Sequence, residues 1–237
     1  MASVSGQYGI AEGDIVDLSL NINPYGPPTS AVRQASKMLH ALNRYPDVSQ
    51  RVLRRRLATL HGVAPEMIVL GNGLDGLLKM IAQTFVERGD HVVIPVPTFP
   101  RYALEVGIMG GCVDQLPLGD GFQLPLDEIL GRITPETKLI FLCSPNNPTG
   151  VPVGRAKVES LLSRDDQGPL VVVDEALAFR GYVGCVDLVS SHSNLMVLRT
   201  FSKAYGLAGV RVGYGVADPE LVAFLEVVRP PFNVNSL

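Results

Sequence analysis

The sequence predicts an α/β fold with three layers, αβα, in which a mostly parallel sheet is covered by helices on both faces. Two observations lead to this prediction. From residue 67 onward, short apolar runs alternate with stretches of helical periodicity, which is the pattern of βαβ units. The chain also has 237 residues, of which 46% are hydrophobic and 18% charged, so it is long and apolar enough to bury a core.

Composition and charge argue against several classes of partner. The net charge of −3 and the pI near 5.8 give no basic field for nucleic acid. No apolar run is long enough to cross a bilayer, and the N-terminus lacks the layout of a signal peptide, so we expect a cytoplasmic protein without a membrane partner. The three cysteines lack CxxC spacing and the four histidines are scattered, so neither a disulfide framework nor a metal site is expected.

The first third of the chain predicts an arm followed by two helices. Residues 1–28 are rich in glycine and proline and end in LSLNINPYGPP, which favours an extended arm with turns rather than a helix. Helical periodicity then begins at Thr29, a candidate N-cap. The segment RYPD breaks it, and Asp47 can cap a second helix, over 49–62. The arginines of this second helix, 54–56, are interpreted as a solvated face rather than a subunit interface.

The remaining elements follow in alternation. Strands are predicted at 67–70, 91–96, 112–118, 138–143, 169–175, 194–198 and 211–217. Helices are predicted at 74–89, 99–110, 126–133, 154–164 and 218–228. The last of these helices is expected to expose apolar surface. Because ligands of open α/β sheets bind at the carboxyl ends of the strands, the residues after each strand are the candidates for a site.

A glycine-rich turn, GNGLDG, follows the first strand. Its glycines, Gly71, Gly73 and Gly76, match the dinucleotide pattern G-x-G-x-x-G. That reading also requires an acidic residue at the end of the next strand, which instead ends in prolines. We therefore favour a smaller role, in which backbone N–H groups at a helix N-terminus hold one phosphate. A plain tight turn is the alternative.

Four later strand ends also carry chemistry-bearing residues. Phe99 could stack on a planar ligand, and the segment SPNNPTG fixes an irregular turn that aims amide side chains at one place. Asp174 ends an apolar strand, so it should be buried and should need a cationic partner. Lys203 lies between two buried strands and could form a Schiff base, although a lone lysine is more often a surface residue. Arg211 is suited to phosphate oxygens.

Together these residues would satisfy one ligand, pyridoxal 5′-phosphate. Its aldehyde reacts with a lysine, its pyridine nitrogen pairs with an acid, its ring stacks on an aromatic side chain and its phosphate needs a cradle. The motifs NINPYGPP, RYPD, GNGLDG, CSPNNPTG, VVVDEA and LRTFSKAYGLAGVRVGY occur in this order along nearly the whole chain. In these motifs the chain resembles the fold-type I pyridoxal-phosphate-dependent aminotransferases, specifically the histidinol-phosphate aminotransferase group.

The resemblance implies a role for each matching position around the cofactor ring. It implies that Lys203 is the Schiff-base and proton-shuttling lysine and that Asp174 pairs with the pyridine nitrogen. It implies that Asn147 donates to the phenolic oxygen and that Phe99 stacks on the ring.

The resemblance also implies a phosphate site and a second subunit. The phosphate cradle would be made by Gly73, Leu74, Asp75, Ser202 and Arg211. Tyr45 would reach the phosphate of a neighbouring subunit, which implies a homodimer. Residues 1–28 would be the N-terminal arm and residues 29–237 the cofactor-binding large domain.

The chain departs from the family pattern at two points. Leu177 stands where the family usually has a tyrosine or another aromatic residue, so one hydrogen bond to the phenolic oxygen is expected to be missing. The small C-terminal domain, which carries the arginine that grips the substrate carboxylate, is expected to be absent.

The resemblance implies transfer of an amino group from an amino donor, histidinol phosphate, to a 2-oxo acid such as 2-oxoglutarate. Three alternatives remain open. They are the related threonine-phosphate decarboxylase, a cofactor-binding remnant without turnover, and a dinucleotide-binding oxidoreductase, which would leave Lys203 and Asp174 unexplained.

Overall fold

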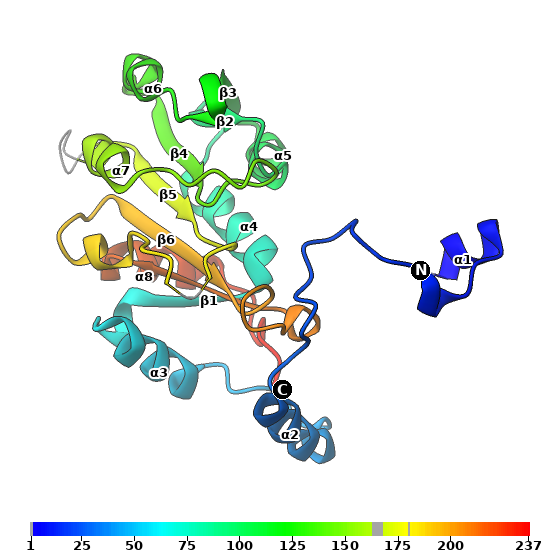
Figure 1. Cartoon of the computed structure of the whole chain (residues 1–237). Helices are drawn as coiled ribbons and strands as arrows, with labels where there is room; N and C mark the ends of the chain where they lie inside the picture. Colours follow the sequence, from blue (N-terminus) through cyan, green and yellow to red (C-terminus); the bar gives the residue numbers. More distant parts are fainter. Residues whose placement is uncertain (1, 163–167, 180) are drawn as a thin grey trace.

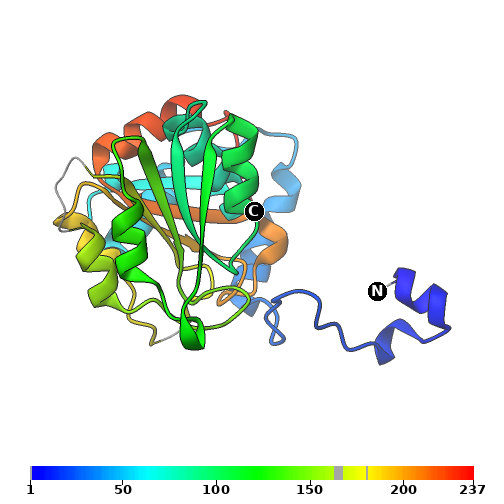
Figure 2. The ribbon, with the colours of Figure 1, turned by 90° about the horizontal axis from the view of Figure 1, so that it is seen from above.

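The computed structural model of the chain describes residues 2–162, 168–179 and 181–237. A seven-stranded sheet lies between two layers of helices, as Figures 1 and 2 show, which confirms the predicted three-layer α/β architecture. Within these residues, no helix is long and apolar enough to cross a membrane.

The elements have the following bounds. The strands are β1 Ile68–Asn72, β2 His91–Val96, β3 Cys112–Pro117, β4 Thr137–Cys143, β5 Leu170–Asp174, β6 Leu195–Thr200 and β7 Val212–Ala217. The helices are α1 Ala2–Tyr8, α2 Thr29–Met38, α3 Arg51–His61, α4 Gly73–Phe85, α5 Arg101–Met109, α6 Leu126–Arg132, α7 Arg155–Leu162 and α8 Pro219–Val228. The last two residues of the helix predicted at 154–164 lie outside the described residues.

The strand order is β1-β7-β6-β5-β4-β2-β3, and of these seven strands β7 runs in the direction opposite to the other six. The carboxyl ends of β1, β2, β4, β5 and β6 therefore meet at one edge of the sheet. Because β7 is antiparallel, its amino end lies at that same edge, where Val212 pairs with Asn72 and Gly213 with Thr200. This brings Arg211, the residue before β7, to the edge where the other candidate residues lie.

Two apolar cores lie on opposite faces of the sheet. Side chains alternate along each strand, so Val171 and Val173 of β5 enter one core while Val172 enters the other. The first core lies under α3, α6 and α7, and the second under α4, α5 and α8. Since both faces are covered, the central strands are apolar throughout, and a polar residue at the end of such a strand is desolvated.

Helix starts differ in detail from the predictions. Thr29 is the first residue of α2, and the N-cap is Pro28, whose extended backbone turns its carbonyl toward the N–H groups of Ala31 and Val32. Asp47 does not cap α3, because its carboxylate accepts hydrogen bonds from Ser49 N at 2.9 Å and Ser49 Oγ at 2.6 Å. The Asp47 side chain closes a local turn instead, which short polar residues do readily.

Residues 2–19 extend away from the sheet, with α1 standing clear of the body in Figures 1 and 2. The prediction of a segment without helix is wrong for Ala2–Tyr8, which form a helix without a buried residue. The following residues are extended and exposed, with Val16 81% and Leu18 87% exposed. α8 likewise exposes Phe224 and Val227, as the sequence predicted.

Candidate functional site

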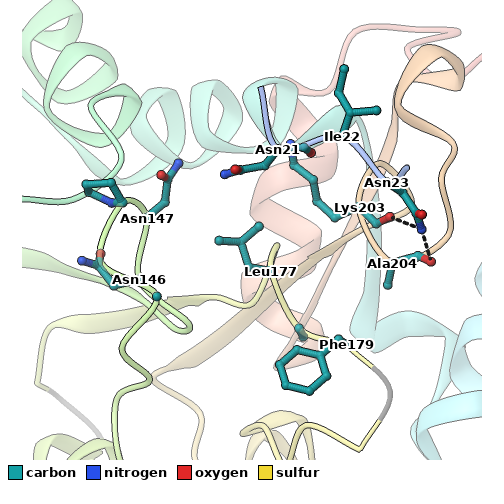
Figure 3. Close-up of a pocket in the computed structure, with 12 residues that line it drawn as sticks. Asn21, Ile22, Asn23, Asn146, Asn147, Leu177, Phe179, Lys203 and Ala204 are labelled. Carbon is teal, nitrogen blue, oxygen red and sulfur yellow. Dashed lines mark hydrogen bonds between the residues drawn. The ribbon is translucent and has the colours of Figure 1, made fainter. Parts of the chain in front are cut away.

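Two adjoining cavities lie at the carboxyl edge of the sheet. The inner cavity has a volume of about 310 Å³ and reaches down to the ends of β4, β5 and β6. The outer cavity, of about 520 Å³, opens above it and is shown in Figure 3. The two share a set of lining residues, Asn21, Ile22, Asn147, Leu177 and Lys203. Lys203 therefore stands where one cavity passes into the other.

The inner cavity brings together eight of the ten site residues that the sequence predicts. These are Leu74, Asp75, Phe99, Asn147, Asp174, Ser202, Lys203 and Arg211. Gly73 lies directly behind the cavity, because a Cβ atom added there would clash with the Arg211 guanidinium. Tyr45 does not line it. That side chain is 82% exposed and stacks on Phe232 with ring centroids 4.7 Å apart.

Asp174 forms the floor of the inner cavity and is only 2% exposed. Its Oδ2 accepts a hydrogen bond from the Tyr102 hydroxyl at 2.7 Å, and its Oδ1 accepts one from Ala176 N at 2.8 Å. No basic side chain of the described residues forms an ion pair with it, so the cationic partner expected for this carboxylate is not a side chain of these residues. Burial raises the pKa of Asp174 to about 6, against the opposing effect of these two hydrogen bonds.

Lys203 projects from the segment after β6 toward the N-terminal arm. Its Nζ donates to the Asn21 carbonyl at 2.8 Å, and the Asn23 amide donates to the carbonyls of Lys203 and Ala204, both at 3.2 Å. Burial and the nearby Arg211 guanidinium lower the pKa of Lys203. The lowered pKa increases the fraction of neutral amine, the form that can act as a nucleophile.

The opposite end of the inner cavity is built on the N-terminus of α4. Gly73 there has φ of 65°, and its N–H donates to the carbonyl of Arg211 at 3.0 Å. The N–H groups of Leu74 and Asp75 come next in the first helical turn, where they have no intrahelical acceptor. The Arg211 guanidinium lies over this turn, held by the Ala208 carbonyl and the Asp75 carboxylate, each at 3.2 Å. These donors, with Ser202 beside them, suit an anion.

The side walls are supplied by Phe99 and Asn147. Phe99 precedes α5 by two residues, is half-buried, and meets the Tyr102 ring edge-on with centroids 5.6 Å apart. The Asn147 loop is fixed by its neighbour Asn146, which is bonded to Thr98, Thr149 and the Pro97 carbonyl. Asn147 itself has no side-chain hydrogen bond to the described residues, and Figure 3 shows its amide beside the cavity, opposite Leu177 and Lys203.

The family described as aminotransferase class I and II matches residues 13–237. The chain belongs to that family. It is 42% identical over 231 residues to the histidinol-phosphate aminotransferase of Moorella thermoacetica, an alignment that covers 94% of this chain and 59% of the relative. The chain thus spans about three fifths of the length of this curated relative.

Solved structures agree with the family assignment. The histidinol-phosphate aminotransferase of Sinorhizobium meliloti, solved in complex with pyridoxal 5′-phosphate, superposes with a TM-score of 0.84 at 28% identity, covering 99% of this chain and 64% of that one. The L-threonine-O-3-phosphate decarboxylase of Porphyromonas gingivalis gives a TM-score of 0.79 at 25% identity, with coverage of 92% and 67%.

Three residues of this class I and II aminotransferase sequence belong to the site although the sequence reasoning did not identify them. Tyr102 binds Asp174, while Asn21 and Asn23 bind the Lys203 segment. The arm motif NINP contains both asparagines, so its composition gave a partial signal. Tyr102 gave none, since it falls at an apolar position of α5. No cluster of histidine, cysteine or acidic residues within the described ranges could hold a metal ion.

Proposed function

We propose that this family member binds pyridoxal 5′-phosphate in the inner cavity and transfers amino groups. The observation that carries the proposal is the buried Asp174 carboxylate, which has neutral hydrogen-bond donors but no cation among the described residues. A buried carboxylate is stabilised when an opposite charge approaches it. A protonated pyridine nitrogen would supply that charge, and Lys203 lines the same cavity.

The remaining residues fit the other parts of the cofactor. Phe99 would cover one face of the ring, Asn147 would donate to the phenolic oxygen, and the first turn of α4 with Ser202 and Arg211 would hold the phosphate. Leu177 offers no second donor to the phenolic oxygen. When bound, the cofactor supplies an aldehyde that reacts with amines and a ring that accepts electrons.

Lys203 would act as the proton carrier of the reaction. Its Nζ lies at the junction of the cavities and has a lowered pKa, so it can accept a proton from the substrate Cα and return it. The Asn21 carbonyl, which accepts a hydrogen bond from Nζ at 2.8 Å, would orient the amino group.

The amino donor we propose is histidinol phosphate and the acceptor a 2-oxo acid such as 2-oxoglutarate, which would place the protein in histidine biosynthesis in the cytoplasm. The support comes from the resemblance in the motif LRTFSKAYGLAGVRVGY and from the name of the 42% identical relative. The threonine-phosphate decarboxylase reaction is the second candidate, because an enzyme of that name shares the fold with a TM-score of 0.79.

We also propose a homodimer in which Tyr45 of one subunit reaches the phosphate of the other. Tyr45 is 82% exposed, and the neighbouring arm leaves apolar side chains such as Leu18 in solvent. In this arrangement residues 1–28 are the arm and residues 29–237 the cofactor-binding domain. Sedimentation equilibrium of the wild type with and without the cofactor would test it, and a monomer under both conditions would contradict it.

The cofactor assignment is tested by an absorbance titration with pyridoxal 5′-phosphate. Wild-type protein should develop a pH-dependent visible band, and Lys203→Ala should not. Lys157→Ala is the matched control, because Lys157 is also half-buried and also donates to a backbone carbonyl, that of Leu124 at 3.0 Å. Its band should equal that of the wild type. Absence of a lysine-dependent band would overturn the proposal.

The substrate assignment is tested by single-turnover reaction of the cofactor-loaded protein. Histidinol phosphate should bleach the visible band, and 2-oxoglutarate should restore it. O-phosphothreonine would instead release carbon dioxide if the decarboxylase reaction were the correct one. If neither amine reacted, both substrate assignments would be overturned. The cofactor assignment would then depend on the absorbance titration alone.

A further inference from the structure

Tyr102 is fully buried and makes its side-chain hydrogen bond inside the protein. It is the second residue of α5 and is 0% exposed. Its ring lies parallel to that of Phe141, with centroids 4.9 Å apart and an interplanar angle of 3°, and meets Phe99 edge-on. Contacts on both sides hold the ring in one orientation, so the position of its hydroxyl is fixed.

The hydroxyl is directed at the acid of the proposed cofactor site. Tyr102 Oη donates to Asp174 Oδ2 at 2.7 Å, across 72 residues of sequence. The other oxygen, Oδ1, is held by Ala176 N at 2.8 Å. With one fixed donor on each oxygen, the carboxylate cannot rotate without losing a hydrogen bond in a buried place. Each oxygen keeps a second lone pair for a ligand.

We propose that Tyr102 is a positioning residue for Asp174, whose hydroxyl both orients the carboxylate toward the cofactor ring nitrogen and favours its charged form. The inference rests on the proposed function, because it concerns how the acid meets that nitrogen. Tyr102 does not line the inner cavity, so it acts through Asp174. The segment that enters α5 thereby presents Phe99 to the ring face, and the first turn of α5 presents Tyr102 to the acid.

The electrostatic surroundings of Asp174 support a role for this hydroxyl. The pKa of Asp174 is raised to about 6, chiefly by burial and to a smaller extent by the Glu175 and Asp75 carboxylates. Cys143 also faces it, and burial raises the pKa of that thiol to about 12, so it stays neutral. Against these effects stand the hydrogen bonds from Tyr102 and Ala176. Tyr102 is therefore the side chain in this set that stabilises the charged form of Asp174.

The test is Tyr102→Phe, which keeps the ring and its stacking and removes the hydroxyl. In the ligand-free protein, carbon-13 NMR of labelled aspartate should show the Asp174 carboxyl titrating about one pH unit higher. The pH below which affinity for pyridoxal 5′-phosphate declines should rise by the same amount. Near pH 6 this would lower the affinity by up to about tenfold.

An analogue that carries CH in place of the ring nitrogen separates this effect from general damage. It keeps the phosphate and the aldehyde but has no atom to pair with Asp174, so Tyr102→Phe should not weaken its binding. Tyr214→Phe is the matched control, because Tyr214 is 2% exposed and its hydroxyl is bonded to His61 at 2.9 Å, in the core on the other face of the sheet. Tyr214→Phe should not change the pH below which cofactor affinity declines.

If Tyr102→Phe does not fold, site-specific incorporation of 3-fluorotyrosine at position 102 gives the opposite change. The more acidic phenol is a stronger donor, so the Asp174 titration should move to lower pH. An unmoved Asp174 titration in either protein would overturn the inference. If the wild type binds no cofactor, the proposed function fails. If Asp174→Asn lowers cofactor affinity but Tyr102→Phe does not, the proposed function stands and only the role of Tyr102 fails.

Discussion

The two ends of the inner cavity hold their charged side chains in different ways. At the ring end, Asp174 is 2% exposed and bonded only to neutral donors. At the phosphate end, the Arg211 side chain is 41% exposed and already paired with Asp75 at 3.2 Å. A buried charge without a counter-charge is costly, whereas an exposed ion pair contributes little.

This difference assigns separate tasks to the two ends. The ring end lowers the stability of the ligand-free protein and recovers that free energy when a cation arrives. At the phosphate end, ligand binding relieves little unfavourable free energy, because water and Asp75 already solvate Arg211. Binding at that end should depend on geometry and on salt concentration, and binding at the ring end on the charge of the ligand.

The largest effect is expected for Asp174→Asn, which removes the charge and keeps the size. Affinity for pyridoxal 5′-phosphate should fall about a hundredfold or more, because a buried ion pair loses one partner. Ligand-free protein should become more stable at pH 8, by as much as about 3 kcal/mol, since an ionised Asp174 no longer has to be buried. Urea unfolding and an absorbance titration measure the two quantities.

Asp187→Asn provides the control, because the Asp187 side chain is 69% exposed and pairs with Arg155 at the surface. It should change neither quantity measurably. A ligand-free Asp174→Asn protein that is less stable than the wild type at pH 8, yet binds the cofactor normally, would contradict the contrast between the two ends.

A smaller effect is expected for Arg211→Lys, which keeps the charge and removes the planar fork. Affinity for pyridoxal 5′-phosphate should fall about tenfold, because lysine cannot reproduce two parallel hydrogen bonds to a phosphate. The analogue without a ring nitrogen should lose affinity equally, and the loss should depend on salt. Equilibrium titrations at low and high ionic strength measure this.

Arg101→Lys is the matched substitution at this end, since Arg101 also faces Asp75, at 3.7 Å, but does not line the inner cavity. It should leave cofactor affinity unchanged. If Arg211→Lys weakened only the ligand that carries the ring nitrogen, the two ends would be coupled rather than independent.

The smallest effect is expected in how the free energy of unfolding of the ligand-free protein depends on pH between 4 and 6.5. In this range His61 and Asp174 change that free energy in opposite directions. Burial lowers the pKa of His61 from 6.5 to about 4, so its contribution to stability is lost as pH falls from about 6.5 to 4. The pKa of Asp174 is raised from 3.8 to about 6, so its contribution makes the protein less stable as pH rises from 3.8 to about 6. His61→Phe should make this second trend visible in urea unfolding between pH 4 and 6.5. A variant that still loses stability on acidification in this range would disprove the assignment.

Much of the site could be predicted because it depends on local sequence and on one property of parallel sheets. Phe99, Asp174 and Lys203 each follow an apolar run of a few residues, and parallel strands bring their carboxyl ends together. Arg211 reached the same edge for a different reason, the antiparallel course of β7, which its apolar pattern does not reveal.

The sequence by itself determined which residues follow the strands and hence the chemistry of the cavity. Only the tertiary structure decided what those residues bind when no ligand is present. Tyr102 lies 72 residues from Asp174, and Asn21 lies 182 residues from Lys203. Such partners are selected by the packing of α5 and the arm over the sheet edge. Periodicity reports whether a side chain is buried, whereas the acceptor that a buried hydroxyl reaches depends on how whole elements pack.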